Sequence, residues 1–449
     1  MQPSQVTVIG AGLAGSEAAW QLAERGVRVR LVEMRPNVAS PAHHGSDMAE
    51  LVCSNSLKGT DPATAPGMLK RELEAMGSLV MRVARATAVP AGSALAVDRA
   101  GFSQAITGAV SSHPLVEFVH EEARELPGGD VIVTTGPLTS PAFESALSSL
   151  VGAERLAFFD AAAPIIDADS IDRAVVFAAS RYGKGGGSDY LNCPLDHGDY
   201  EVLIDALVSA DRVTAKDFET AELFQACQPV EEVARRGLDA IRFGALKPVG
   251  LVDPRTGLRP WAVVQLRPEN REGTAYNLVG FQTNLTFDEQ RRVFRSIPGL
   301  HSAEFLRYGV MHRNTFVDAP RLLTPTLAVI SEPRVHIAGQ LAGTEGYLEA
   351  AAGGLVAALD VAAARAGSRL PALPGTTALG ALLAYASDPR VIDYQPMHVN
   401  LGLLPPLEPP VRNKGSRHAA LSQRADRDFV QWLAEIRTIV TPGLTGAMR

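Results

Sequence analysis

The first residues that could do chemistry are three glycines near the N-terminus, in the segment Gly10-Ala-Gly-Leu-Ala-Gly15. They follow a short apolar strand, Val6–Ile9, and precede a stretch with helical spacing, Ser16–Arg25. In such a turn the first glycine permits the bend, the second lets backbone approach a pyrophosphate, and the third lets helix and strand pack closely. The pattern predicts that a dinucleotide binds at Gly10, Ala11, Gly12, Leu13, Ala14 and Gly15.

Glu33 follows the next apolar strand, Val27–Val32. An acid at this place bonds an unphosphorylated ribose, which favours FAD or NAD over NADP. Position along the chain favours FAD, because flavoproteins of the glutathione-reductase type often begin with such a turn and return late to cover the flavin. A strand at Asp130–Thr135 that runs into Gly136 resembles a further element of those enzymes.

A second glycine-rich turn supplies the late return. It follows the strand Val335–Ala338 and precedes Glu349–Ala364, an alanine- and glycine-rich stretch that predicts a closely packed helix. The N-terminus of such a helix can face the pyrophosphate or a flavin carbonyl. We therefore predict further FAD-binding residues at Gly339, Gly343, Gly346 and Tyr347.

Three cysteines, Cys53, Cys193 and Cys227, are the candidate nucleophiles. Their odd number and wide spacing argue against a disulfide framework and fit a reducing cytoplasm. Cys53 lies in a Ser/Asn-rich turn near the predicted dinucleotide, with Lys58 five residues later. Cys227 lies near the C-terminal end of a predicted helix, where the dipole does not favour a thiolate. Each cysteine taken singly is more often structural, and Cys193 shows no feature of a catalytic residue.

Composition and missing motifs exclude several classes of protein. Hydrophobic residues make up 46% and charged residues 20% of the 449, as in soluble globular proteins. The longest apolar stretch, Ala350–Ala364, contains an aspartate and is too short to span a bilayer, and no signal peptide is predicted. Neither a GxSxG nor an HExxH motif is present. His43 and His44 lack further ligands at metal-binding spacing, so we predict no metal site.

The order of elements predicts an α/β fold with a Rossmann-type, glutathione-reductase-like FAD-binding domain interrupted by an inserted α+β domain. The predicted parts are residues 1–166, the inserted domain 167–298 on the substrate side, and residues 299–449. Within the insertion, Ala262–Leu266 and Asn277–Gln282 are predicted antiparallel strands. In the first part, apolar residues at helical spacing predict one helix over Pro66–Ala84.

The charge distribution is uneven. The chain has a net charge of −7, so a nucleic-acid partner requires a local basic patch. Residues 411–449 hold seven Lys and Arg against three acids. This basic tail is a candidate RNA-facing surface, although a solvated helix face explains the same charges equally well.

Several segments outside the first glycine turn resemble the folate- and FAD-dependent tRNA (uracil-5-)-methyltransferases. The resemblance runs from the N-terminus to at least Pro406. Its most specific segments are LVCSNSL at Leu51–Leu57, DYLNCP at Asp189–Pro194, Cys227-x-Pro-Val-Glu-Glu, KPVGLVDPRT at Lys247–Thr256, VGFQT at Val279–Thr283, YGVMHRNT at Tyr308–Thr315, and Ala338–Ala351.

The resemblance implies methylation of the T-loop uridine of tRNA, position 54, to 5-methyluridine. It implies 5,10-methylenetetrahydrofolate as one-carbon donor, reduced FAD as reductant, and NAD(P)H to reduce the flavin again. It further implies Cys53 as nucleophile and Cys227 as general base, with the reverse assignment left open by the sequence, and His312 stacking the pterin. Neither a membrane nor an obligate protein partner is expected.

Two alternatives remain at the level of sequence. One is a related flavoprotein that modifies wobble uridines of tRNA, which shares the N-terminal FAD unit; the LVCSNSL and YGVMHRNT segments favour the T-loop enzyme. The other is a flavin-containing RNA-binding protein without transferase activity. The presence of both Cys53 and Cys227 speaks against it.

Overall fold

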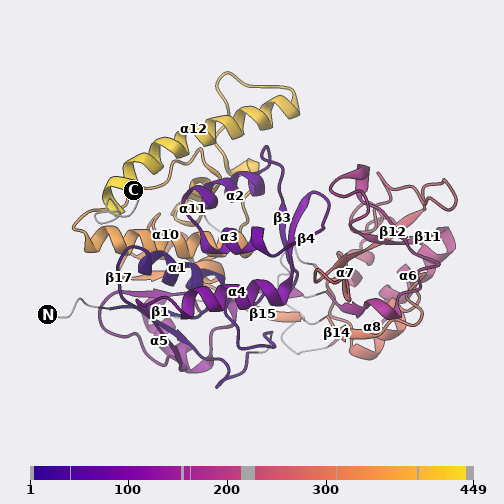
Figure 1. The fold of residues 1–449 in the computed structure, drawn as a ribbon, viewed down its shortest axis with the longest axis horizontal. Coiled ribbons are helices and arrows are strands. Elements are labelled where there is room, and N and C mark those ends of the chain that lie inside the picture. The colour runs from indigo at the N-terminus through magenta and orange to yellow at the C-terminus, as the bar shows by residue number, and fades with distance from the viewer. Residues whose placement is uncertain are drawn as a thin grey trace.

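Two lobes lie side by side in the computed structural model (Figure 1). It describes residues 5–40, 42–152, 156–161, 163–213, 228–309, 311–391 and 394–440, of which 156–161, 311–314 and 440 are described as backbone only. The larger lobe carries the N-terminal elements and those near the C-terminus. The smaller lobe comes from the middle of the chain.

The larger lobe is built on a six-stranded sheet in the order β16-β17-β7-β1-β2-β6. Neighbouring strands are parallel except for the pair β16 and β17. The strands are β1 (Val6–Ile9), β2 (Val29–Glu33), β6 (Val116–His120), β7 (Val131–Val133), β16 (Ala328–Val329) and β17 (Glu332–Ile337). The predicted Rossmann-type sheet is confirmed, and its last central strand, β17, arrives about 200 residues after β7.

Helices α1 (Leu13–Ala23) and α10 (Tyr347–Arg365) pack tightly against each other over this sheet. A Cβ added to Gly354 would lie 2.0 Å from the carbonyl oxygen of Ala14, so only glycine fits there. This contact confirms the predicted role of small residues in the late helix. By length and composition α10 could cross a membrane, but 78% of that stretch is buried inside the protein, as in a core helix.

The predicted single helix over Pro66–Ala84 is wrong. The structure has two helices, α2 (Ala65–Ala75) and α3 (Leu79–Ala86). Gly77 between them has a φ of +75°, in the left-handed region where a helix ends. The Ser78 side chain then accepts the N–H of Met81 and caps α3, which turns the chain into a new direction.

The smaller lobe holds a second six-stranded sheet, in the order β10-β11-β12-β13-β9-β14, with every neighbouring pair antiparallel. Its strands are β9 (Ile165–Asp167), β10 (Phe177–Ala178), β11 (Leu191–Leu195), β12 (Ala262–Pro268), β13 (Ala275–Leu278) and β14 (Phe305–Arg307). The predicted antiparallel pair, β12 and β13, is confirmed. β9 begins before the predicted boundary at 167, and β14 lies after the predicted boundary at 298. The domain boundaries stay a prediction.

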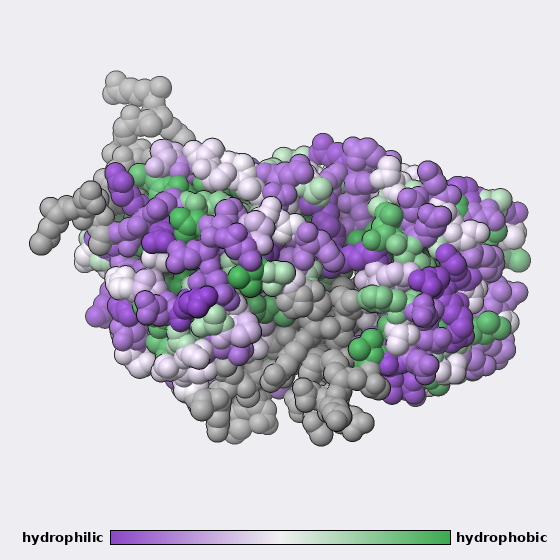
Figure 2. Space-filling view, turned by 90° about the horizontal axis from the view of Figure 1, so that it is seen from below, coloured by the Kyte–Doolittle hydropathy of each residue, from purple (hydrophilic) through white to green (hydrophobic). Residues whose placement is uncertain are grey.

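Shorter elements join the lobes and cover the sheets. Those of the larger lobe and the junction are β3 (Ser56–Gly59), β4 (Ala88–Val89), β5 (Ala94–Val97), β8 (Leu156–Ala161), β15 (Met311–Phe316), α4 (Arg99–Ser111), α5 (Pro141–Val151), α9 (Ala319–Leu322), α11 (Ala378–Ala386) and α12 (Lys414–Val440). The smaller lobe adds α6 (His197–Ser209), α7 (Val230–Ala234) and α8 (Phe287–Phe294). Among the residues coloured in Figure 2, hydrophilic ones are the most frequent, with hydrophobic ones scattered between them on both lobes.

Candidate active site

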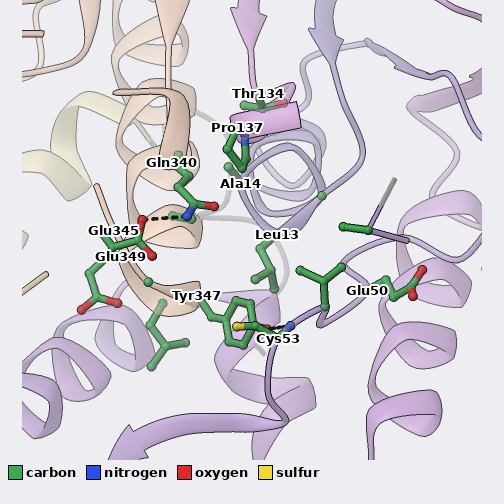
Figure 3. A pocket seen from close by; sticks show the side chains of 18 of the residues that line it. Leu13, Ala14, Glu50, Cys53, Thr134, Pro137, Gln340, Glu345, Tyr347 and Glu349 are labelled. Carbon is green, nitrogen blue, oxygen red and sulfur yellow. Dashed lines mark hydrogen bonds between the residues drawn. The ribbon is translucent and has the colours of Figure 1, made fainter. Parts of the chain in front are cut away.

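A cavity of about 500 Å³ opens in the larger lobe where α1 and α10 begin. Figure 3 shows its walls. They come from the start of α1 (Leu13 and Ala14), from the turn after β7 (Thr134 and Pro137), from the start of α10, and from the segment that carries Cys53. Of the predicted site residues, those that line the cavity are Gly10, Gly12, Leu13, Ala14, Glu33, Cys53, Gly339, Gly346 and Tyr347. Ala11, Gly15 and Gly343 are buried and are not among its lining residues.

The first glycine turn fits the predicted mechanics of a phosphate-binding turn. A Cβ on Gly15 would lie 1.8 Å from the Gly10 carbonyl oxygen, so the helix could not approach the strand. Gly10 has a φ of +99°. A Cβ on Gly12 would meet no described atom within 4 Å, because this glycine faces the open cavity. A pyrophosphate can therefore come close to the backbone here.

Both helices that begin at the cavity have glycine as N-cap, Gly12 for α1 and Gly346 for α10, and neither has a side-chain cap. The first N–H groups of a helix have no partner within the helix and carry a partial positive charge. Two helix ends of this kind on one cavity form a site for anionic or carbonyl oxygen.

The Glu33 carboxylate is held in its ionised form. Its Oε2 accepts the N–H of Ala11 at 2.8 Å, and its Oε1 accepts the N–H of Arg35 at 3.1 Å and its Nε at 2.9 Å. Burial alone would raise the pKa of Glu33, but the bonds and charge of Arg35, with the Ala11 bond, lower it overall. A carboxylate accepts about four hydrogen bonds, so a ribose hydroxyl can still bind.

Cys53 is half-buried and lies against the phenol of Tyr347 (Figure 3). The Tyr347 Oη accepts the N–H groups of Cys53 at 2.9 Å and Ser54 at 3.1 Å, and lies 3.0 Å from Cys53 Sγ. Burial raises the pKa of Tyr347 well above its ordinary value, so the phenol keeps its proton. With two N–H groups already donating to this oxygen, its own O–H is directed to the sulfur.

Two arginines hold the segment around Cys53 from both sides. Arg99 donates to the carbonyl oxygen of Leu51, and Arg267 of β12 donates to Ser54 Oγ at 2.7 Å and to Asn55 Oδ1 at 2.8 Å. Neither arginine was predicted from the sequence. No local signal identifies Arg267, which is 213 residues from Ser54 and comes from the smaller lobe.

Two lysines on the cavity wall were also not predicted as site residues. Lys58 pairs with the buried carboxylate of Glu349 at 2.7 Å. Lys70 is buried and donates to the carbonyl oxygens of Leu57 at 2.6 Å and Gly59 at 2.9 Å. Burial lowers the pKa of Lys70 to about 8. Lys58 lies five residues after Cys53, which was a signal for this lysine. Lys70 lies inside the predicted helix over Pro66–Ala84, and the sequence gave no signal for it.

The structure describes the remaining residues of interest only in part. Cys227 lies outside the described residues, and so do positions 441–449 of the basic tail. His312 is on β15, in register with Asp160 of β8, but its side chain is not described. Cys193 is fully buried in β11 of the smaller lobe. His43 lines the cavity and contacts Ser40 Oγ through Nδ1 at 2.8 Å, and burial and the Arg35 charge lower its pKa to about 4.

Known proteins provide an independent comparison. A family model described as Glucose inhibited division protein A matches residues 5–369. The methylenetetrahydrofolate--tRNA-(uracil-5-)-methyltransferase TrmFO of Geobacter sulfurreducens is 55% identical over 432 residues, which cover 96% of this chain and 99% of that protein. The protein of the same name from Heliobacterium modesticaldum is 53% identical over 431 residues, 96% of this chain and 98% of that one.

Among solved structures, Aquifex aeolicus GidA in its form II crystal has a TM-score of 0.69 at 16% identity, covering 98% of this chain and 74% of that chain. This likeness supports the α/β fold. The near full-length relatives confirm the resemblance predicted from the sequence. The chain belongs to the TrmFO family of methylenetetrahydrofolate--tRNA-(uracil-5-)-methyltransferases.

Proposed function

We propose that this protein transfers the one-carbon unit of 5,10-methylenetetrahydrofolate to C5 of a tRNA uridine, with FAD as its redox cofactor. The main structural support for the proposal is the contact between Cys53 Sγ and Tyr347 Oη. This contact lies on the wall of a cavity at which two helices begin without a side-chain cap. Relatives at 52–55% identity that bear the methyltransferase name support it and favour it over the wobble-uridine alternative.

The cavity fits FAD. Gly10–Ala14 and the N-terminus of α1 would hold the pyrophosphate, Glu33 a ribose, and the Gly339 turn with the start of α10 the flavin side. The absence of a side chain at Gly12 leaves room for the phosphates. When bound and reduced, FAD supplies the hydride that turns an exocyclic methylene into a methyl group.

Cys53 acts as the nucleophile in this proposal. Its thiolate forms a bond to C6 of the uracil, and the electron pair of the C5–C6 double bond moves to give an enolate that is nucleophilic at C5. Tyr347, which keeps its proton, donates to the sulfur and favours the thiolate. The main-chain N–H groups of Cys53 and Ser54 orient that phenol.

Cys227 is proposed as the base. C5 bonds to the methylene carbon as one of its two carbon–nitrogen bonds in the folate breaks. The base then removes the C5 proton, and the second carbon–nitrogen bond breaks, so that tetrahydrofolate leaves and an exocyclic methylene remains on C5. After reduction of the methylene, the S–C6 bond breaks and the Cys53 thiolate leaves. We further propose that His312 stacks the pterin, that the target is uridine 54 of the T-loop, that NAD(P)H reduces the flavin again, and that the basic tail on α12 contacts the tRNA.

The test is to incubate the purified protein with FAD, NADPH, methylenetetrahydrofolate labelled in its methylene carbon, and tRNA that lacks T-loop methylation. We expect label in 5-methyluridine at position 54 and none when this uridine is replaced by cytidine. Label at a wobble uridine, or no label in RNA while the flavin is reduced normally, would overturn the proposal.

A further inference from the structure

Three arginines from different elements meet beside Cys53. Arg99 begins α4, Arg267 lies on β12, and Arg307 ends β14. Arg99 pairs with Glu269 at 2.8 Å. Among the described residues neither Arg267 nor Arg307 has an ion-pair partner, and nearby Glu50 is paired with Arg35 at 3.3 Å. The cluster therefore has more positive than negative charge.

Two guanidinium nitrogens of this cluster are buried without a hydrogen-bond partner in the described part of the chain. They are Arg99 Nη2 and Arg307 Nε. Leaving a buried donor unpaired costs about 1–3 kcal/mol, and more when the group is charged. Burial and the charge of Arg99 lower the pKa of Arg307, so the two guanidinium groups are close enough to repel. A bound anion would remove both costs.

The pair also lies next to the reacting cysteine. Arg99 bonds the carbonyl oxygen of Leu51, two residues before Cys53, and both Arg99 and Arg307 are close enough to Cys53 to interact with it electrostatically. Arg99 is held firmly by Glu269 and by the carbonyl of Leu51. Arg307 has one long described bond, from Nη2 to the carbonyl oxygen of Ala42 at 3.4 Å, so most of its donors remain available.

We propose that Arg99 and Arg307 form an oxyanion-binding site that takes a backbone phosphate of the RNA at the target uridine; this inference rests on the proposed function. A uracil placed against Cys53 brings its own phosphate with it through the ribose. Guanidinium groups match the oxygens of phosphate in a bidentate manner. Extruding a base costs a few kcal/mol of stacking and pairing, which a phosphate contact at this place offsets.

Carboxylates of the folate glutamyl tail are also oxyanions, and the experiment must distinguish them from phosphate. Arg307→Met is the main variant, because methionine retains much of the side-chain volume and Arg307 makes few bonds within the protein. Arg124→Met is the matched control: it removes the same charge from a side chain that is 78% exposed, with its acidic neighbour at 3.9 Å. Flavin content and thermal unfolding check that each variant folds.

The binding of T-arm RNA is measured at several salt concentrations. We expect Arg307→Met to weaken binding about tenfold and to reduce the slope of log affinity against log salt by roughly 0.7–0.9, the loss of one phosphate contact. Arg307→Lys keeps the charge, so the slope stays and only affinity falls. Arg124→Met leaves affinity within about twofold of wild type.

Unchanged RNA affinity and slope in Arg307→Met would overturn the inference. So would a rise in the folate KM that appears with polyglutamyl but not monoglutamyl folate, because the anion would then be a carboxylate. These outcomes are separate from failure of the proposed function. If the proposed function is wrong, the wild-type protein will transfer no methyl group. This result does not depend on how the variants bind RNA.

Discussion

The segment that holds Cys53 and the strand that holds Cys193 place the same side chain in opposite surroundings. Cys53 is half-buried on the wall of a cavity, with a phenol 3.0 Å from its sulfur and positive charge nearby. Cys193 is fully buried in β11, among the apolar residues of the smaller lobe's core. Burial raises the pKa of the Cys193 thiol, which therefore stays neutral and unreactive.

This difference shows that the chemistry of a cysteine here is decided by residues far away in sequence. Tyr347 is 294 residues from Cys53, and Arg267 comes from the other lobe. A cysteine in a strand core has no such partners to favour a thiolate. Three predictions test this difference between Cys53 and Cys193.

Replacing each cysteine with alanine should separate the two regions most clearly. Cys53→Ala removes the nucleophile, so methyl transfer to tRNA should fall by at least about a thousandfold, while FAD remains bound. Cys193→Ala should transfer methyl groups within about twofold of the wild-type rate. Single-turnover transfer of labelled methyl groups measures both. Normal transfer by Cys53→Ala would contradict the assignment and direct attention to Cys227.

Tyr347→Phe should have a smaller effect, because the nucleophile remains. It removes the phenol that favours the thiolate and leaves the N–H groups of Cys53 and Ser54 without their acceptor, at about 1–3 kcal/mol. We expect kcat to fall roughly 10- to 100-fold with little change in the KM for tRNA. A purely structural role would lower flavin content and kcat in parallel. A fall in kcat in fully loaded enzyme is therefore the informative result.

The third prediction concerns pH and stability. Because burial raises the pKa of the folded-state Cys193 thiol above its ordinary 9.0, only the unfolded chain ionises as the pH passes 9. The contribution of Cys193 to stability is complete below pH 9 and is lost above it, by about 1.4 kcal/mol per pH unit. Urea unfolding at pH 8 and pH 10 should show the wild type losing roughly 1 kcal/mol relative to Cys193→Ala. Equal losses in both proteins would show that the thiol ionises in the fold.

Local patterns predicted several residues that the structure brings together at the cavity, while their binding of FAD stays a prediction. The glycine turn, Glu33 and the small-residue helix each depend on neighbours a few residues away, and the structure brings them together on one sheet. The helix over Pro66–Ala84 failed because Gly77 ends a helix even within a continuous apolar pattern. The contacts of Cys53 could not be predicted, because they depend on the angle at which α10 starts and on how the two lobes meet.

The order of strands in the large sheet also bears on how the protein is made. β17 completes the row beside β7, and α10 packs on α1 through Gly354 and Ala14, yet both arrive after residue 330. During synthesis, the first 150 residues emerge without β17 beside β7 and without α10 on α1. The growing chain thus has no complete cofactor cavity until α10 has left the ribosome. Flavin binding can therefore stabilise only a nearly complete chain. Truncated chains would be poor in flavin and exposed to proteolysis.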